Sequence, residues 1–335
     1  MALTINKGIT LTPPVIGRIT MGHTVVKGEG KTLPVKDDHF SLTTLVQNKT
    51  TREWGVHDLQ KVHGKGSAKL RAIPVTIAYN DVNLNLNNSF SAFDPKKGRV
   101  LCTGNGDRAR RVTDDGVKEI DCPRPEACKY GQDARCKNMS RAYFKVDGQE
   151  DELGVFILRT TSFNSLNYLG TRLGQLSALT GGCMAGVPMM LIMESKTTAQ
   201  SFREPFHYAD LVTRPGMTLF DAVKQGRDYQ LAVTEAGLSL EGMEEVLRGG
   251  LANSDFADDI EDMNEWFSDD DLVAAAAAAS GQGQQSESGG ASSLTERLRL
   301  AVASKMEAAP AAAVLEVAAN EAPAEAPQEP VAAVA

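Results

Sequence analysis

Four of the five cysteines follow one another at spacings that suit a metal site. They form the pattern C-x19-C-x5-C-x7-C, at Cys102, Cys122, Cys128 and Cys136. Thiolates are preferred ligands of Zn²⁺, and a site closed by four cysteines is structural rather than catalytic. The residues between these cysteines are mostly polar and offer little material for a core, so a bound ion would stabilise the segment. The sequence therefore predicts a structural zinc site made by these four cysteines.

A second interpretation of the same thiols stays open. The odd number of cysteines and the absence of an N-terminal secretion signal favour the reducing cytoplasm, where disulfides are not expected. Basic neighbours such as Arg124 and Lys129 favour the thiolate form, which binds metals. In the alternative, Cys102 is buried in a strand and the three later cysteines are idle thiols in a basic loop. Cys183 is expected to be a small buried apolar residue.

The cysteine segment lies in the most positive part of the chain. Residues 96–145 contain thirteen Lys and Arg against seven Asp and Glu, a net charge of +6. Clustered cations can neutralise phosphates, and the aromatic side chains of Tyr130, Tyr143 and Phe144 could stack on bases. The predicted nucleic-acid-binding residues are Lys96, Lys97, Arg99, Arg108, Arg110, Arg111, Lys129, Arg135, Lys137 and Arg141. The alternatives are a solvated basic face with Phe144 in the core, or a surface for an acidic protein.

The charge of the chain changes sign near residue 251. Residues 1–250 carry a net charge of +5, whereas residues 251–335 carry −13. Within this acidic part, residues 255–272 hold nine carboxylates, and the Ala- and Pro-rich sequence after them buries too little apolar area to fold. We predict a mostly disordered tail over 251–335 in which Trp266 and Phe267 bind a partner. The acidic stretch could instead lie on the basic body in cis, or merely keep the chain soluble.

The elements that must position these residues form an α+β body over 1–250, with the cysteine-rich insertion at about 100–140. β-Branched sequence predicts strands at 14–26 and 39–46, separated by a polar loop. Alternation of Val82, Leu84 and Leu86 predicts a half-buried strand. A hairpin is expected over 140–161, and a second strand pair and two helices follow it later in the chain. This order predicts antiparallel strands with one central helix and a zinc-stapled loop.

The central helix has clear sequence signals at both ends. Ser162 or Asn164 can cap its first turn, and Gly181-Gly182 can end it. Leucines at helical spacing predict its buried face, and they are Leu166, Leu169, Leu173, Leu176 and Leu179.

Three stretches of the sequence resemble a known family. They are "IGRITMGHTV" with "KTLPVKDDHFSLTT", the segment "CPRPEACKYGQDARCK", and "GVFILRTTSFNS". Over roughly residues 15–215 the chain resembles the recombination directionality factor-like proteins of phages and mobile elements. The resemblance implies that the protein binds a large serine integrase and switches it from integration to excision without cleaving DNA. It also implies that Cys102, Cys122, Cys128 and Cys136 correspond to the family's cysteine centre.

The predicted function is that of a non-enzymatic accessory protein of DNA recombination, which binds a recombinase, DNA or both and biases the direction of the reaction. The hairpin over 141–161 and the helix from 164 could present the contact surface. The alternative function is binding or annealing of single-stranded DNA. A metal-dependent hydrolase is less favoured, because the sequence has no H-E-x-x-H, Walker A or G-x-S-x-G motif. No run of eighteen apolar residues occurs, so we expect no membrane partner and a cytoplasmic location.

Overall fold

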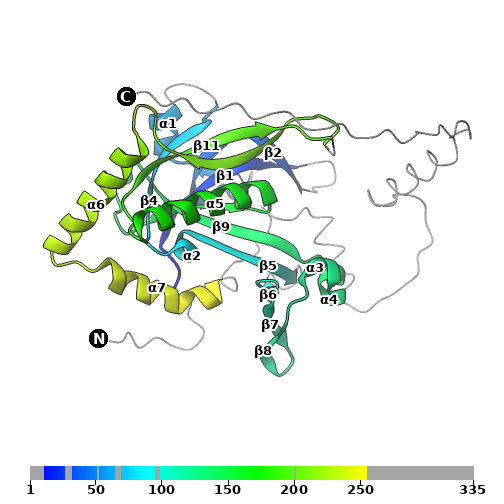
Figure 1. Cartoon of the computed structure of the whole chain (residues 1–335). Helices are drawn as coiled ribbons and strands as arrows, with labels where there is room; N and C mark the ends of the chain where they lie inside the picture. Colours follow the sequence, from blue (N-terminus) through cyan, green and yellow to red (C-terminus); the bar gives the residue numbers. More distant parts are fainter. Residues whose placement is uncertain are drawn as a thin grey trace, which may run out of the picture. The chain divides into compact units, whose positions relative to one another are not determined.

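The computed structural model describes residues 11–26, 32–50, 53–64, 69–94, 99–199 and 201–254 (Figure 1). These residues form one twelve-stranded sheet and several helices. The strands are β1 (Val15–Val26), β2 (Thr32–Gln47), β3 (Trp54–Val56), β4 (Ala72–Ile77), β5 (Leu86–Asp94), β6 (Arg99–Gly104), β7 (Arg108–Thr113), β8 (Gly116–Asp121), β9 (Lys137–Val146), β10 (Val155–Thr160), β11 (Pro188–Lys196) and β12 (Phe206–Val212). The helices are α1 (Asp58–Gly64), α2 (Val82–Asn85), α3 (Arg124–Ala127), α4 (Lys129–Asp133), α5 (Phe163–Thr180), α6 (Leu219–Glu235) and α7 (Leu240–Ser254).

The sheet is mixed rather than purely antiparallel as predicted. Its strand order is β3-β2-β1-β10-β9-β5-β6-β7-β8, and β4 joins β9 to the pair β11–β12. The predicted hairpin is present, because β9 and β10 pair antiparallel. However, β1 lies parallel to β10. Sequence reasoning missed this pairing because it joins strands more than a hundred residues apart, and no local turn signals it.

Helices α5 and α7 pack on opposite faces of the sheet. On β9 and β10, Phe144 and Leu158 belong to the main core with the leucines of α5. Their neighbours Tyr143 and Ile157 pack instead with Leu247 of α7. Successive side chains of a strand point to opposite faces, so the two clusters lie on the two sides of the sheet.

The structure confirms the predicted ends of the central helix α5 and most of its predicted buried face, with one exception. The side-chain oxygen of Ser162 accepts a hydrogen bond from the Ser165 N–H, and Gly181 ends the helix with a left-handed φ of 66°. Leu169, Leu173 and Leu176 are buried against the sheet. Leu179 is 68% exposed, so its assignment to the buried face was wrong.

Three further expectations are corrected by the structure. Val82 and Leu84 lie in the helical turn α2 rather than in a strand, because the Asp81 side chain caps the turn by accepting from the Asn83 N–H. The polar loop after the first strand ends earlier than predicted, since β2 begins at Thr32. The cysteine-rich insertion is not a plain loop but contains β7, β8, α3 and α4.

None of the described helices is long and apolar enough to cross a membrane. Helix α7 extends to Ser254, and the remainder of the predicted acidic tail lies outside the described residues.

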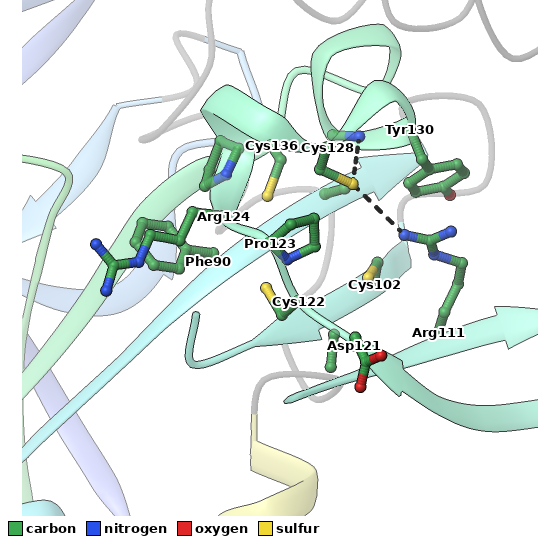
Figure 2. Close-up of a pocket in the computed structure, with 14 residues that line it drawn as sticks. Phe90, Cys102, Arg111, Asp121, Cys122, Pro123, Arg124, Cys128, Tyr130 and Cys136 are labelled. Atoms are coloured by element: carbon green, nitrogen blue, oxygen red, sulfur yellow. Dashed lines mark hydrogen bonds between the residues drawn. The ribbon is translucent and has the colours of Figure 1, made fainter. Parts of the chain in front are cut away.

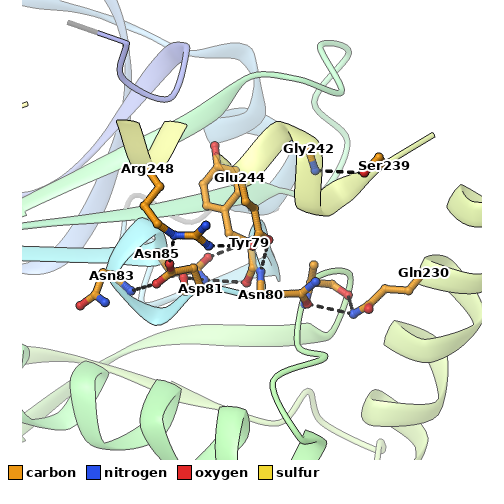
Figure 3. A network of polar contacts seen from close by, with 11 residues as sticks. Tyr79, Asn80, Asp81, Asn83, Asn85, Gln230, Ser239, Gly242, Glu244 and Arg248 are labelled. Carbon is orange, nitrogen blue, oxygen red and sulfur yellow. Dashed lines mark hydrogen bonds and ion pairs between the residues drawn. The ribbon is translucent and has the colours of Figure 1, made fainter. Parts of the chain in front are cut away.

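A polar network attaches α7 and α6 to the body (Figure 3). The Glu244 carboxylate of α7 accepts a 2.6 Å hydrogen bond from the Asn80 N–H. Arg248, one turn later, donates through Nε to Asp81 at 2.9 Å. From α6, the side-chain amide of Gln230 donates to the Asn80 side-chain oxygen at 3.1 Å. The segment between β4 and α2 therefore fixes both C-terminal helices.

Glu244 makes this attachment sensitive to pH. The residue is only 4% exposed, and burial raises its pKa above the ordinary value of 4.5. The folded chain therefore holds the proton more tightly than the unfolded chain, and the free energy of unfolding falls as pH rises from 4.5 through the raised pKa.

We expect the substitution Glu244→Gln to reduce this fall, because glutamine does not ionise and its oxygen can still accept from the Asn80 N–H. Denaturant unfolding between pH 4 and pH 8 measures the effect. Glu245→Gln is the matched control, since Glu245 is exposed on the same helix and should leave the pH dependence unchanged. Identical pH profiles for wild type and Glu244→Gln would contradict the expectation.

Candidate functional site

The four clustered cysteines line one pocket at the base of the β7–β8 hairpin (Figure 2). Cys102 comes from β6, Cys122 follows β8, Cys128 lies between α3 and α4, and Cys136 immediately precedes β9. Cys102 is buried in its strand, and the other three are partly buried. Side chains up to 34 residues apart in the sequence are therefore brought to one place.

Backbone contacts hold the cysteines at the pocket. The Cys122 N–H donates to the Asp107 carbonyl at 2.9 Å, which returns the chain to the start of β7 after the hairpin. The Cys136 N–H donates to the Gly131 carbonyl at 2.7 Å, and the Gly131 N–H donates to Cys128 Sγ at 3.3 Å. An N–H directed at sulfur stabilises the thiolate form that metals bind.

Two glycines allow the cysteines to approach one another, and sequence reasoning missed both. A Cβ atom on Gly131 would lie 3.2 Å from the Cβ atoms of Cys128 and Cys136. A Cβ atom on Gly104 would lie 2.9 Å from Cys122 Sγ. Their positions two or more residues from any cysteine gave no sequence signal, because the crowding arises only when separate segments meet.

Arg111 closes the side of the pocket near Cys128. Its guanidinium lies 3.9 Å from the centroid of the Tyr130 ring and donates toward Cys128 Sγ at 3.8 Å. It also lies opposite Cys102 in the β6–β7 pairing. A cation beside two sulfurs reduces the electrostatic repulsion between neighbouring thiolates.

Burial is the main influence on the pKa values of Cys136 and Cys102. Burial, together with the nearby Cys102, Cys122 and Cys128, raises the pKa of Cys136 to about 12. Burial also raises the pKa of Cys102, opposed by the hydrogen bond from Arg111. The neighbouring thiols contribute to the raised pKa of both Cys102 and Cys136, so these groups lie near enough to repel when ionised, and a bound divalent cation would offset that repulsion.

Four cysteines are suitable ligands for zinc, but their side chains are not arranged around a common metal position. Among the residues that the structure describes, no group of three or more Cys, His, Asp or Glu side chains is arranged to hold a metal ion. The four sulfurs share a pocket but do not form a finished tetrahedron there. Zinc binding would therefore require the cysteine side chains to turn toward one centre.

Two arginines beside the cysteines have strained backbones. Arg124, two residues after Cys122, has a φ of 68°, and Arg135, just before Cys136, has a φ of 50°. Left-handed conformations are uncommon for residues other than glycine and concentrate at functional sites. Both conformations occur at turns of the chain next to cysteines that line the pocket.

The structure separates the predicted nucleic-acid-binding residues into different environments. Arg99, Lys129 and Arg135 are exposed, and Arg110 and Lys137 are partly exposed. Arg108 is exposed but pairs with Asp121 at 2.7 Å. Arg111 is engaged with the cysteine pocket. The residues that remain on the surface are Arg99, Arg108, Arg110, Lys129, Arg135 and Lys137.

Several residues do not match the environments predicted for them. Arg141 is 1% exposed in the middle of the sheet, so the expectation that it contacts phosphate at the surface was wrong. Tyr143 and Phe144 are likewise buried and do not offer stacking surfaces, which for Phe144 agrees with the alternative that placed it in the core. Cys183 is exposed rather than buried. In each case the strand or turn conformation decided which way the side chain points.

Four predicted site residues lie outside the described residues. They are Lys96 and Lys97, between β5 and β6, and Trp266 and Phe267, in the acidic stretch after α7.

Comparison with known proteins identified a family. The family model Gp3-like, described as recombination directionality factor-like, matches residues 16–214. The matched range runs from β1 to just beyond β12 and includes all four cysteines of the pocket. No curated protein and no solved structure matches the chain.

The environments of the thiols predict a clear order of alkylation. With chelator present, iodoacetamide at pH 8 should modify the exposed Cys183 first and Cys136 last. A pKa of about 12 leaves Cys136 with roughly 1 in 10,000 molecules as thiolate at that pH. Peptide mapping by mass spectrometry measures each rate, and denaturant should bring the rates together. Modification of Cys136 as fast as Cys183 in the folded chain would show that the pocket is not formed.

Proposed function

The chain belongs to the Gp3-like family of recombination directionality factor-like proteins, and on this basis we propose that it is a non-enzymatic accessory protein of site-specific recombination. It binds a recombinase, in our proposal a large serine integrase, and biases the direction of the reaction. The observation that carries the proposal is the family match over residues 16–214, which spans nearly the whole sheet.

The proposed mechanism is preferential binding to one conformation of the recombinase. A factor that binds the excision-competent state more tightly than the integration-competent state shifts the population toward excision. Shifting an equilibrium from about 1:99 to 99:1 takes roughly 5.5 kcal/mol of differential affinity. One protein interface can supply this difference, so no chemical step by the accessory protein is needed.

The β7–β8 hairpin is the contact surface that we propose for the recombinase. The strands of the β9–β10 hairpin are mostly buried, so that hairpin offers only its turn. In contrast, β7 and β8 are the last two strands at one edge of the sheet, and in Figure 1 their hairpin projects away from the other strands. Val112 and Val117 face each other across this hairpin and are 41% and 51% exposed. An exposed apolar pair between charged side chains suits a small protein contact.

The cysteine pocket supports this hairpin at its base, and we propose that it holds a structural zinc ion through Cys102, Cys122, Cys128 and Cys136. The ion would supply four bonds between β6, the end of β8 and the segment before β9. The shared pocket, the N–H directed at Cys128 Sγ and the crowded glycines support this assignment. In this proposal, the cysteine pocket fixes the direction in which the β7–β8 hairpin projects from the sheet.

The zinc proposal predicts about one zinc per chain in protein purified without chelator. Cys128→Ser should lower this content at least about tenfold, because a hydroxyl is a poor replacement for a thiolate ligand. Cys183→Ser is the control and should retain the metal, since Cys183 is exposed and is not part of the pocket. Elemental analysis measures the metal, and equal zinc in both variants would contradict the assignment.

The functional proposal predicts that the purified chain increases excision and decreases integration by its cognate serine integrase. Replacing Val112 and Val117 together with serine should weaken this effect about tenfold, equivalent to roughly 1.4 kcal/mol of binding. Leu179→Ser is the matched control, because Leu179 is equally apolar and 68% exposed but lies on α5. Thermal unfolding shows whether each variant is folded.

A different outcome would favour the alternative function. If the chain leaves the integrase unchanged but binds single-stranded oligonucleotides with steep salt dependence, its surface arginines and lysines serve nucleic acid directly. That result would contradict the proposed action on a recombinase.

A further inference from the structure

Helix α6 carries an apolar and basic ridge on its exposed side. The ridge consists of Phe220, Lys224, Arg227 and Leu231, which are spaced by four, three and four residues. This spacing places the four side chains along one side of the helix. Phe220 is 77% exposed and Leu231 is 59% exposed, and the two cations between them are also exposed. Large apolar side chains at helical spacing on a solvent-facing side are typical of a surface that binds another helix.

The opposite side of α6 is already in use. Gly226 is buried there, and a Cβ atom on it would lie 2.5 Å from Cγ2 of Val187, so the helix packs closely on the body. Two acids of α6 lie further round the helix than the ridge. One of them, Asp221, is engaged in the capping box with Thr218, and Asp228 is exposed. The ridge is therefore presented to solvent by a helix whose position is fixed.

The stretch after α7 repeats the spacing of the ridge. Residues 255–272 have the sequence DFADDIEDMNEWFSDDDL, with nine carboxylates and no basic residue. Spacings of four, three and four residues again separate four apolar positions, which are Phe256, Ile260, Met263 and Phe267. On a helix these positions share one side, and Asp259 and Asp271 fall near its edges. We refer to residues 255–272 as the acidic stretch.

We propose that the ridge of α6 binds the acidic stretch of a second copy of this chain. The apolar positions of the two segments match in spacing, and Lys224 and Arg227 meet carboxylates of the stretch. Each copy offers one ridge and one stretch, so two copies exchange their stretches and two equal contacts close a symmetric dimer. Both segments lie outside the matched range 16–214, so the dimer is additional to the proposed function and does not depend on it.

The occupant is a second copy because the chain's own stretch cannot reach the ridge in this register. Helix α7 has 15 residues, which rise about 22 Å from the turn after α6 to Ser254. In Figure 1 this helix leads away from α6. Phe256 comes two residues after Ser254 and can move only about 7 Å from it, whereas it would have to return along α7 to face Leu231. The stretch of another molecule has no such limit.

Sedimentation velocity of the full chain tests the proposal without any recombinase. The chain should pass from monomer to dimer as its concentration rises from about 1 to 100 μM, as expected of a contact with micromolar Kd. The ridge variant, Phe220→Ser with Leu231→Ser, should weaken dimerisation at least about tenfold. The matched control is Phe163→Ser with Leu179→Ser, which removes the same residue types at 72% and 68% exposure from α5 and should dimerise like the wild type.

A mixing experiment shows whether the ridge of one copy meets the stretch of another. The stretch variant, Ile260→Ser with Phe267→Ser, should also be monomeric alone. Mixed in equal amounts, the ridge variant and the stretch variant should associate, because together they retain one intact ridge and one intact stretch. If the ridge variant does not fold, the stretch variant still decides the matter.

Three results would overturn the proposal. They are a wild-type chain that stays monomeric over this concentration range, a dimer that persists unchanged in the ridge or stretch variant, and a mixture of the two variants that does not associate. None of these results bears on whether the chain acts on a recombinase, because no recombinase is present in the experiment.

Discussion

The pairing of β9 with three other strands is the interaction on which the rest of the structure depends. β9 lies between β10 and β5 and also pairs with β4. Its alternating side chains divide the protein into two sides, with Ala142 and Phe144 in the main core and Arg141 and Tyr143 on the other face. Because each strand must keep one register to preserve this division, the pairing fixes the positions of α5, α7 and the cysteine-bearing segment.

The pairing of β9 also positions part of the cysteine pocket. Cys136 stands directly before β9, and Cys102 lies on β6, which reaches β9 through β5. Two of the four thiols are thus positioned by the sheet, whereas Cys122 and Cys128 are positioned by the short segment after β8. A bound ion would add a link between these two groups and make the projecting hairpin stiffer. Under the proposed function, in which the protein acts by contact, this would be a sufficient role for the metal.

The positive charge of the cysteine segment is partly neutralised within the segment itself. Many of the surface arginines of the cysteine segment already have partners, as Arg108 does in Asp121. The net charge of a segment therefore overstated how much positive surface it offers to nucleic acid, because cross-strand neighbours neutralise one another.

The sequence by itself determined the local features. Ser162 and Gly181 marked the ends of α5, the turn residues after Val146 marked the β9–β10 hairpin, and the cysteine spacing marked a thiol cluster, because each signal involves neighbouring residues. Only the tertiary structure decided the parallel pairing of β1 with β10, the burial of Arg141, and the glycines that let the cysteines meet. These features depend on which distant segments become neighbours. A shift of one residue in strand register moves each side chain to the opposite face, although the local composition of the sequence stays the same.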